Sequence, residues 1–348
     1  MRGFCAFWLA AAFVSSFWSQ VILDVRKYRY QDIIPWITQT NQVFQAIWID
    51  TPFKGYSGRF LPTEAVYDFE DMGQKFQRGS LETFLGSREE FEEVVKWCRQ
   101  NSLSLYARVR LFEQQEGFLT AVWDISDFYP DYTVAFERTQ THRKLQQIVE
   151  KLQKLPVDVW VVDITGLSLS YQRKASQWVK QNFPKALVMA DEESISTLSA
   201  FDFWRWQKEM RHTNLPVLPT FGSSGVLWVR EEEVSSSGVF YYFLARQKKR
   251  SLVISPAMVS VCKRIEEVEP SRWEDVRFVY TAPEHLWGIS SKGVVSFYTG
   301  ETLRFTNYVM DIPLFLSPVI GTSYFRSFPK TVEGLFLPWS FSLWKVER

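Results

Sequence analysis

The feature that most constrains the fold is an alternation of short apolar segments with amphipathic ones. The apolar segments include VILDV at 21–25, QAIWI at 45–49 and DVWVVDI at 158–164. Strands that form almost continuous apolar runs are typical of parallel sheets with helices on both faces. The pattern predicts strands at 21–25, 45–49, 103–109, 158–164, 186–190, 226–229 and 252–255, and helices at 31–42, from 87 onward, at 139–155 and at 170–182.

The predicted repeat is one strand followed by one helix, and residues 21–283 have about the length of a (β/α)8 TIM barrel, ~250 residues. A doubly wound sheet followed by a β module would produce the same periodicity, so the pattern alone does not choose between them. After Pro283 the helical period ends, and Gly, Pro and Ser turns separate short strands. We therefore expect an α/β fold, with a barrel over 21–283 and a small antiparallel β-sandwich domain over 284–348. Its strands are predicted at 287–290, 294–298, 303–309, 314–319 and 340–346.

The N-terminal segment has the pattern of a targeting signal. Arg2 precedes an apolar run at 4–18 that is interrupted only by two serines. This length suits the apolar region of a signal peptide and is too short for a comfortable membrane span. We expect an exported chain, periplasmic or extracellular, in which residues 1–20 are a cleaved signal peptide or an uncleaved membrane anchor. No later segment predicts a membrane span.

Charge and metal-ligand content exclude several functions. The chain carries 40 Lys and Arg against 39 Asp and Glu, a net charge of +1, so no basic field favours nucleic acid. Three cysteines and three histidines are scattered without metal-site spacing. No phosphate-binding loop or cofactor fingerprint is present. We therefore expect no cofactor, no metal site and no nucleic-acid partner, while the oligomeric state stays open.

One segment carries a resemblance to a known family. Residues 67–86, YDFEDMGQKFQRGSLETFLG, resemble the segment after the second barrel strand of the α-amylase family, glycoside hydrolase family 13. The likeness is strongest over 45–110, continues at 200–203 (AFDF) and is weaker in the closing LPWSFSLWKV. It implies a barrel with a C-terminal β domain and retaining chemistry on α-glucosidic bonds, with a carboxylate nucleophile and a carboxylic acid/base.

The resemblance places three carboxylates in catalytic positions. Asp163 aligns with the nucleophile of the fourth strand, Asp191 with the acid/base and Glu233 with the acid that holds substrate hydroxyls; Glu192 is the alternative acid/base. The family has an Arg two residues before the nucleophile, where this chain has Val161. Because that cation is missing and its replacement is apolar, we expect the pKa of Asp163 to be raised.

Other family features are lost. In the third-strand motif Arg108, Phe112 and Glu113 replace an Asp, the metal-binding Asn and a His. The short interval between Glu113 and Asp158 leaves no room for the family's inserted domain and calcium site, so that loop domain is expected to be reduced. Arg108, Arg110 and Glu113 are candidates for an ion-pair network that replaces the lost site.

Candidate substrate-binding residues each have a structural alternative. Tyr67 and Asp68 match the family motif but also suit loop architecture, and Trp204 and Trp228 offer sugar-stacking faces but also suit core packing. The acidic run at 191–193 also suits a helix start, 230–233 also suits a solvated loop, and Asp163 also suits a helix N-cap.

Two functions follow. The first is a catalytically degenerate α-amylase-like barrel, a pseudoenzyme that binds an oligosaccharide or α-glucan or serves as a scaffold. The alternative is an active retaining α-glycosidase in which Asp163 is the nucleophile. The combined loss of the Arg and of the third-strand groups favours the first, because catalytic groups that act as a unit fail together.

Overall fold

The fold is described from a computed structural model, in which two compact units are distinguished: residues 22–205, and residues 1–21 with 206–348. The described residues are 20–38, 43–50, 88–112, 125–131, 133–191, 203–205, 226–228, 236–247, 251–268, 273, 275–282, 285–298, 300, 302–309, 316–320, 324–328, 331–337 and 340–346.

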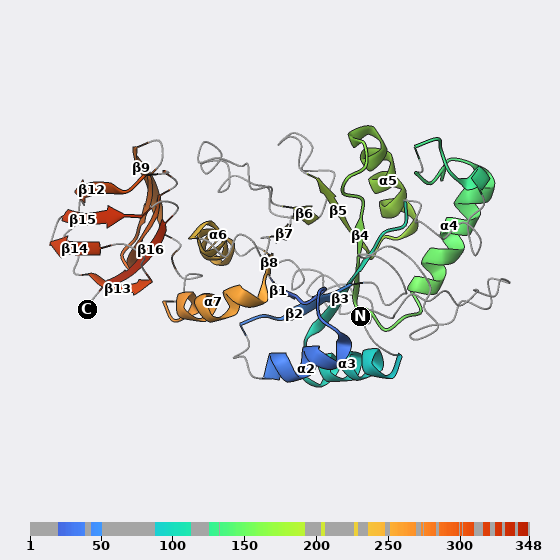
Figure 1. The fold of residues 1–348 in the computed structure, drawn as a ribbon, viewed down its shortest axis with the longest axis horizontal. Helices are drawn as coiled ribbons and strands as arrows, with labels where there is room; N and C mark the ends of the chain where they lie inside the picture. The colour runs from blue at the N-terminus through green and yellow to red at the C-terminus, as the bar shows by residue number, and fades with distance from the viewer. Residues whose placement is uncertain are drawn as a thin grey trace, which may run out of the picture. The chain divides into compact units, whose positions relative to one another are not determined.

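A curled sheet of parallel strands begins at β1 and continues through the first unit (Figure 1). Its strands pair in chain order, each with the next, and all the pairs are parallel. The prediction of a parallel α/β sheet is therefore confirmed. The strands are β1 (Val21–Asp24), β2 (Ala46–Ile49), β3 (Ser104–Val109), β4 (Val159–Asp163), β5 (Leu187–Asp191) and β6 (Phe203–Arg205).

Amphipathic helices connect these strands. The helix α4 buries Leu145, Ile148, Val149 and Leu152, which recur at the spacing of one helix face. Strands β2 and β4 are buried along their whole length, as expected for a sheet that is covered on both faces. Helices α2 and α3 pack against each other. The connecting helices are α2 (Tyr30–Thr38), α3 (Arg88–Gln100), α4 (Thr139–Leu152) and α5 (Leu169–Asn182), with a 3-10 turn, η3 (Ile125–Asp127).

The other unit continues the strand–helix alternation. Strand β7 (Val226–Trp228) pairs in parallel with β8 (Leu252–Ile254). The backbone N–H of Leu252 donates to the carbonyl of Gln20, directly before β1, at 3.0 Å. The helices are α6 (Ser236–Gln247) and α7 (Val259–Glu266), preceded by a 3-10 turn, η8 (Pro256–Met258). None of the described helices is long and apolar enough to span a membrane.

Two antiparallel sheets follow, which confirms the predicted change of pattern. One has the strand order β13-β16-β11-β10-β9 and the other β12-β15-β14. The first strand, β9, precedes the expected boundary at 284, and β9, β14 and β15 were not predicted. The strands are β9 (Arg277–Ala282), β10 (His285–Ile289), β11 (Gly293–Tyr298), β12 (Arg304–Val309), β13 (Leu316–Ile320), β14 (Tyr324–Phe328), β15 (Thr331–Phe336) and β16 (Ser340–Val346).

An aromatic core joins the antiparallel strands to each other and to α6. Phe336 of β15 packs in one cluster with Trp287, Tyr298 and Trp344 of the other sheet. Helix α6 contacts β8 and also β11 and β16. Its Phe243 ring lies 5.2 Å from that of Trp273 and 6.4 Å from that of Phe341, measured between centroids. This helix is therefore shared between the last parallel strand and the antiparallel sheet.

Candidate functional site

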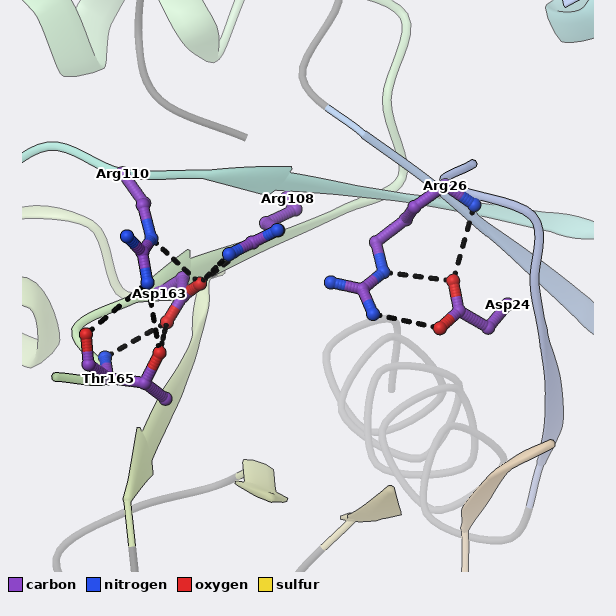
Figure 2. Close-up of polar contacts among 6 residues, drawn as sticks. All are labelled: Asp24, Arg26, Arg108, Arg110, Asp163 and Thr165. Atoms are coloured by element: carbon purple, nitrogen blue, oxygen red, sulfur yellow. Dashed lines mark hydrogen bonds and ion pairs between the residues drawn. The ribbon is translucent and has the colours of Figure 1, made fainter. Parts of the chain in front are cut away.

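Asp163 is the last residue of β4, at the carboxyl edge of the parallel sheet (Figure 2). The strand VWVVD is apolar until this position, so the fold carries a carboxylate to the end of a fully buried strand. The Asp163 side chain has 0% relative exposure. The carboxyl ends of parallel strands are where α/β barrels assemble their sites, and this is the place that the sequence predicts for Asp163.

Two arginines from the neighbouring strand bind one oxygen of this carboxylate. Arg108 in β3 contacts Oδ2 through Nε at 2.7 Å and through Nη2 at 2.5 Å. Arg110, just after β3, donates from Nε to the same oxygen at 3.0 Å. Both arginines are largely buried, with side chains 13% and 16% exposed. Both therefore meet the carboxylate largely away from solvent.

Thr165 binds the other oxygen and completes the shell. Its backbone N–H donates to Oδ1 of Asp163 at 2.9 Å and its hydroxyl donates at 2.6 Å. Arg110 also donates from Nη2 to the Thr165 hydroxyl oxygen at 3.1 Å. The Asp-x-Thr spacing is the sequence signal for this turn, because an Asp side chain readily accepts from the backbone two residues on.

The pKa of Asp163 is lowered to about 2, so the prediction of a raised pKa was wrong. Burial acts to raise this pKa, but the charges of Arg108 and Arg110 and the hydrogen bonds from Thr165 outweigh it. Val161 does stand where the family has an Arg, yet the cations come from β3 instead. The pKa of Arg108 is raised, because the charges of Asp163, Asp50 and Asp24 and the hydrogen bond to Asp163 outweigh burial, which acts to lower it.

A second ion pair lies at the end of β1, also drawn in Figure 2. Asp24 accepts from Arg26 Nε at 2.9 Å on one oxygen and from Arg26 Nη2 at 2.8 Å on the other. The Arg26 guanidinium carbon lies 3.7 Å from the centroid of the Trp48 ring in β2, a cation–π contact. This cluster was not predicted from the sequence; its only signal there is the D-x-R spacing of Asp24, inside the predicted strand 21–25, and Arg26, directly after it.

The position of the family's metal-binding Asn is apolar here. Phe112 is fully buried, and its ring packs edge to face against Phe136, Tyr171 and Trp178. Within the part of the chain that the structure describes, no group of three or more His, Cys, Asp or Glu side chains could hold a metal ion. Phe112 is therefore a packing residue of an aromatic cluster at this position.

The remaining predicted site residues are described only in part. Asp191 is the last residue of β5 and pairs in register with Arg205 of β6. Trp204 is in β6 and Trp228 is in β7, and only their backbones are described. The other candidates lie outside the described residues: Tyr67, Asp68, Glu113, Glu192 and Glu233. Their convergence with Asp163 stays a prediction.

The chemistry open to Asp163 follows from its contacts. Five donor atoms surround its two oxygens: Nε and Nη2 of Arg108, Nε of Arg110, and the N and Oγ1 of Thr165. Both oxygens of this buried carboxylate therefore accept from donors of the protein itself. The arrangement is that of a counter-ion for two arginines.

Comparison with known proteins adds the wider context. No family model matches the sequence, and no curated protein matches it either. Solved structures do match. An α-amylase from Geobacillus thermoleovorans complexed with acarbose has a TM-score of 0.56 and 10% identity, over 95% of this chain and 98% of that one. A cyclic α-maltosyl-(1→6)-maltose hydrolase from Arthrobacter globiformis, in complex with maltose, has a TM-score of 0.54 and 10% identity, over 93% and 98%.

A third similar structure is the isomaltulose synthase of Klebsiella sp. LX3, with a TM-score of 0.56 and 8% identity, over 94% of this chain and 99% of that one. Identities this low establish the fold and leave the activity open. The chain therefore has the fold of the α-amylase family of glycoside hydrolases, as the resemblance in its sequence predicts.

Proposed function

We propose that this chain is an exported, catalytically degenerate α-amylase-type barrel that binds an α-glucan or related oligosaccharide without hydrolysing it. The observation that carries the proposal is the shell around Asp163, whose two oxygens are both occupied by donors from Arg108, Arg110 and Thr165. The carboxylate in the nucleophile position serves the fold, as the counter-ion of two arginines. A barrel of this kind keeps its architecture while losing its bond-breaking group.

The proposed architecture is an eight-stranded barrel over 21–283 followed by a β-sandwich. Six parallel strands pair in chain order, and β7 pairs in parallel with β8. The hydrogen bond from Leu252 at the start of β8 to Gln20 beside β1 supports closure of the ring between its last and first strands. Residues 1–20 are proposed as the export signal or anchor, from their sequence pattern.

The proposed ligand class rests on the similar structures. The α-amylase is in complex with acarbose and the cyclic α-maltosyl-(1→6)-maltose hydrolase is in complex with maltose, so oligosaccharides are the ligands of two proteins with this fold. The proposed binding residues are Tyr67, Asp68, Trp204 and Trp228, because aromatic faces stack on sugar rings. A scaffold role without any ligand is the variant of this proposal that a binding measurement distinguishes.

The second candidate is an active retaining α-glycosidase, with Asp163 as nucleophile, Asp191 or Glu192 as acid/base and Glu233 as stabiliser. One observation favours it: the lowered pKa keeps Asp163 ionised at neutral pH, which a nucleophile requires. The same arginines that lower this pKa also occupy the oxygen that would attack, and for this reason we rank it second.

The test compares hydrolysis with binding. The wild-type chain is expected to release no product from maltoheptaose or an aryl α-glucoside, and to bind maltoheptaose saturably in calorimetry. Asp163→Asn serves as the site variant. Asp127→Asn is the matched control, because Asp127 is a buried carboxylate that accepts from Thr141 at 2.7 Å and from Lys144 at 2.6 Å on a different element.

Each outcome separates the candidates. Turnover by the wild type that Asp163→Asn abolishes and Asp127→Asn retains would overturn the degenerate reading and establish the glycosidase. Binding without turnover supports the proposal. Absence of both turnover and binding would leave the scaffold variant.

A further inference from the structure

The segment that contains helices α4 and α5 concentrates positive charge. Residues 137–185 carry nine Lys and Arg against four Asp and Glu, whereas the whole chain has a net charge of only +1. One of the four acids is Asp163, which is buried and paired with Arg108 and Arg110 from outside this segment. The rest of the chain is therefore net negative, and the positive charge of the molecule is gathered in one part of it.

Helices α4 and α5 pack side by side and run in the same direction. Trp178 Nε1 donates to Nδ1 of His142 at 3.0 Å, and one turn further along both helices Gln146 Nε2 donates to Oδ1 of Asn182 at 3.0 Å. Because the two contacts advance together along both helices, the helices are parallel. Their outer sides therefore form one continuous surface, which we call the α4–α5 face.

Basic side chains stand on this face and are exposed. Arg143 in α4 and Lys154, just after its end, lie about three turns apart on the side opposite the buried residues of the helix. Arg173 in α5 and Lys185, which follows that helix, are exposed as well. The exposed positions of the two helices hold only polar and charged side chains, so they offer no apolar group to insert into a lipid layer.

Ion pairs within the molecule do not neutralise these four cations. In the part of the chain that the structure describes, no carboxylate forms an ion pair with the side chain of Arg143, Lys154, Arg173 or Lys185. The acid that α4 contributes to the face is Glu150, and α5 contains no acid. The four positive charges therefore face solvent and are available to an anionic partner.

We propose that the α4–α5 face docks on the headgroups of a bilayer that contains anionic phospholipids. Two parallel helices spread the cations over an area, which complements the two-dimensional array of negative charges on such a bilayer. The exposed positions of these helices carry no aromatic side chain on which a nucleic-acid base could stack, which favours a bilayer over a single-stranded nucleic acid. The proposal concerns a surface separate from the Asp163 cluster and does not rest on glucan binding.

The chemistry of the face predicts an electrostatic and reversible contact. Each Lys or Arg close to an anionic bilayer raises binding about fivefold at low salt. Added salt screens this attraction, because the Debye length falls to ~3 Å at 1 M. Since the exposed positions of the two helices have no apolar side chain to insert, salt is expected to remove most of the binding.

The experiment is co-sedimentation of the full chain with vesicles of phosphatidylglycerol and phosphatidylcholine in equal amounts, and with vesicles of phosphatidylcholine alone. Residues 1–20 are present in every variant, so the neutral vesicles measure what that segment contributes. The wild type is expected to bind the anionic vesicles about a hundredfold more tightly than the neutral ones in about 20 mM salt, and to lose most of this preference in about 0.5 M salt.

Two variants with equal changes of net charge separate this face from the charge of the whole chain. The site variant replaces its four cations with glutamine and is expected to lose most of the preference for anionic vesicles, about a hundredfold. The control variant removes four exposed cations from α3, from α7 and from the turn before β11, and is expected to change binding only a few-fold. The site substitutions are Arg143→Gln, Lys154→Gln, Arg173→Gln and Lys185→Gln, and the control substitutions are Lys96→Gln, Arg99→Gln, Lys263→Gln and Lys292→Gln.

Three results would overturn the proposal. The first is a wild type that binds anionic and neutral vesicles equally at low salt, a measurement that needs no variant. The second is an equal loss of binding in the site and control variants, with melting temperatures showing that both are folded. The third is binding of heparin, a soluble anionic polysaccharide, that depends on the four site residues while anionic vesicles are not bound, which would assign the face to a different polyanion.

Discussion

At the residue scale, Asp163 shows how far sequence reasoning reaches and where it stops. Its place at the end of a buried strand follows from the apolar run before it, and the structure has it there. Its environment could not be read from its own strand. Arg108 lies in β3 and Arg110 directly follows that strand, two residues on, and both side chains reach across to Asp163 of β4. The residue pattern of one strand does not reveal which side chains of the neighbouring strand contact a given residue at its end.

Substitution of either arginine that binds Asp163 is expected to destabilise the folded chain, and the two substitutions should do so by different amounts. Arg108 makes two contacts with Asp163 and Arg110 makes one, so Arg108→Met is expected to lower the free energy of unfolding by about 3 kcal/mol and Arg110→Met by less. Urea denaturation at pH 7 measures both. The control is Lys174→Met, whose ion pair with Glu137 is exposed and should contribute little. Equal effects of all three variants would show that burial does not strengthen the Asp163 cluster.

The same cluster predicts an acid-sensitive window. The pKa of Asp163 is about 2 when folded against an ordinary 3.8, so the carboxylate contributes about 2 kcal/mol above pH 4, which is lost as the pH falls toward 2. Arg108→Met removes one cation, which raises the folded pKa of Asp163, so the stability lost on acidification should become smaller, while the pH at which the loss begins is set by the unfolded chain and stays near pH 4. Thermal melting between pH 2 and pH 5 measures the fall in melting temperature, and an equal fall in Arg108→Met and the wild type would contradict the assigned role of Arg108.

At the element scale, hydrophobic periodicity predicts the parallel strands and their helices closely. Predicted strand 158–164 is β4 at Val159–Asp163, and predicted helix 139–155 is α4 at Thr139–Leu152. The antiparallel strands are harder to predict from the sequence. The short strands β14 (YFRSF) and β15 (TVEGLF) contain charged residues, and β15 also contains a Gly. Such strands are specified by their cross-strand partners more than by their own pattern.

Gly293, at the start of β11, predicts a steric limit within these elements. A Cβ atom built there would overlap the Trp273 ring and the backbone carbonyl oxygen of Trp344, and the backbone of β16 has little freedom to move away. Gly293→Ala is therefore expected to lower the melting temperature of the antiparallel sheets by several degrees. Lys292→Ala, one residue earlier and exposed, is the matched control. A melt of Gly293→Ala that coincides with that of Lys292→Ala would refute the close packing.

At the scale of the whole molecule, the domain boundary predicted at 283 does not coincide with the division of the chain into compact units. Residues 206–348 form one compact unit, which includes α6, α7 and both antiparallel sheets. Helix α6 buries Val239, Tyr242, Phe243 and Leu244. A helix that is apolar on more than one face has to be covered by more than one partner, here β8 and the strands β11 and β16. Periodicity marks where helices stop but does not show which strands cover them.

This packing makes the strands after 283 necessary for the helices before it. In a chain that ends at residue 283, Phe243 loses Phe341, and the guanidinium of Arg264 in α7 loses the Val319 carbonyl in β13. Exposing aromatic side chains costs about 1.5–3 kcal/mol each. Residues 20–283 are therefore expected to bind a hydrophobic dye and to melt without a cooperative transition, whereas residues 20–348 melt cooperatively. If residues 20–283 melted like the longer chain, α6 would belong to the parallel sheet alone, and the antiparallel sheets would be a separable module.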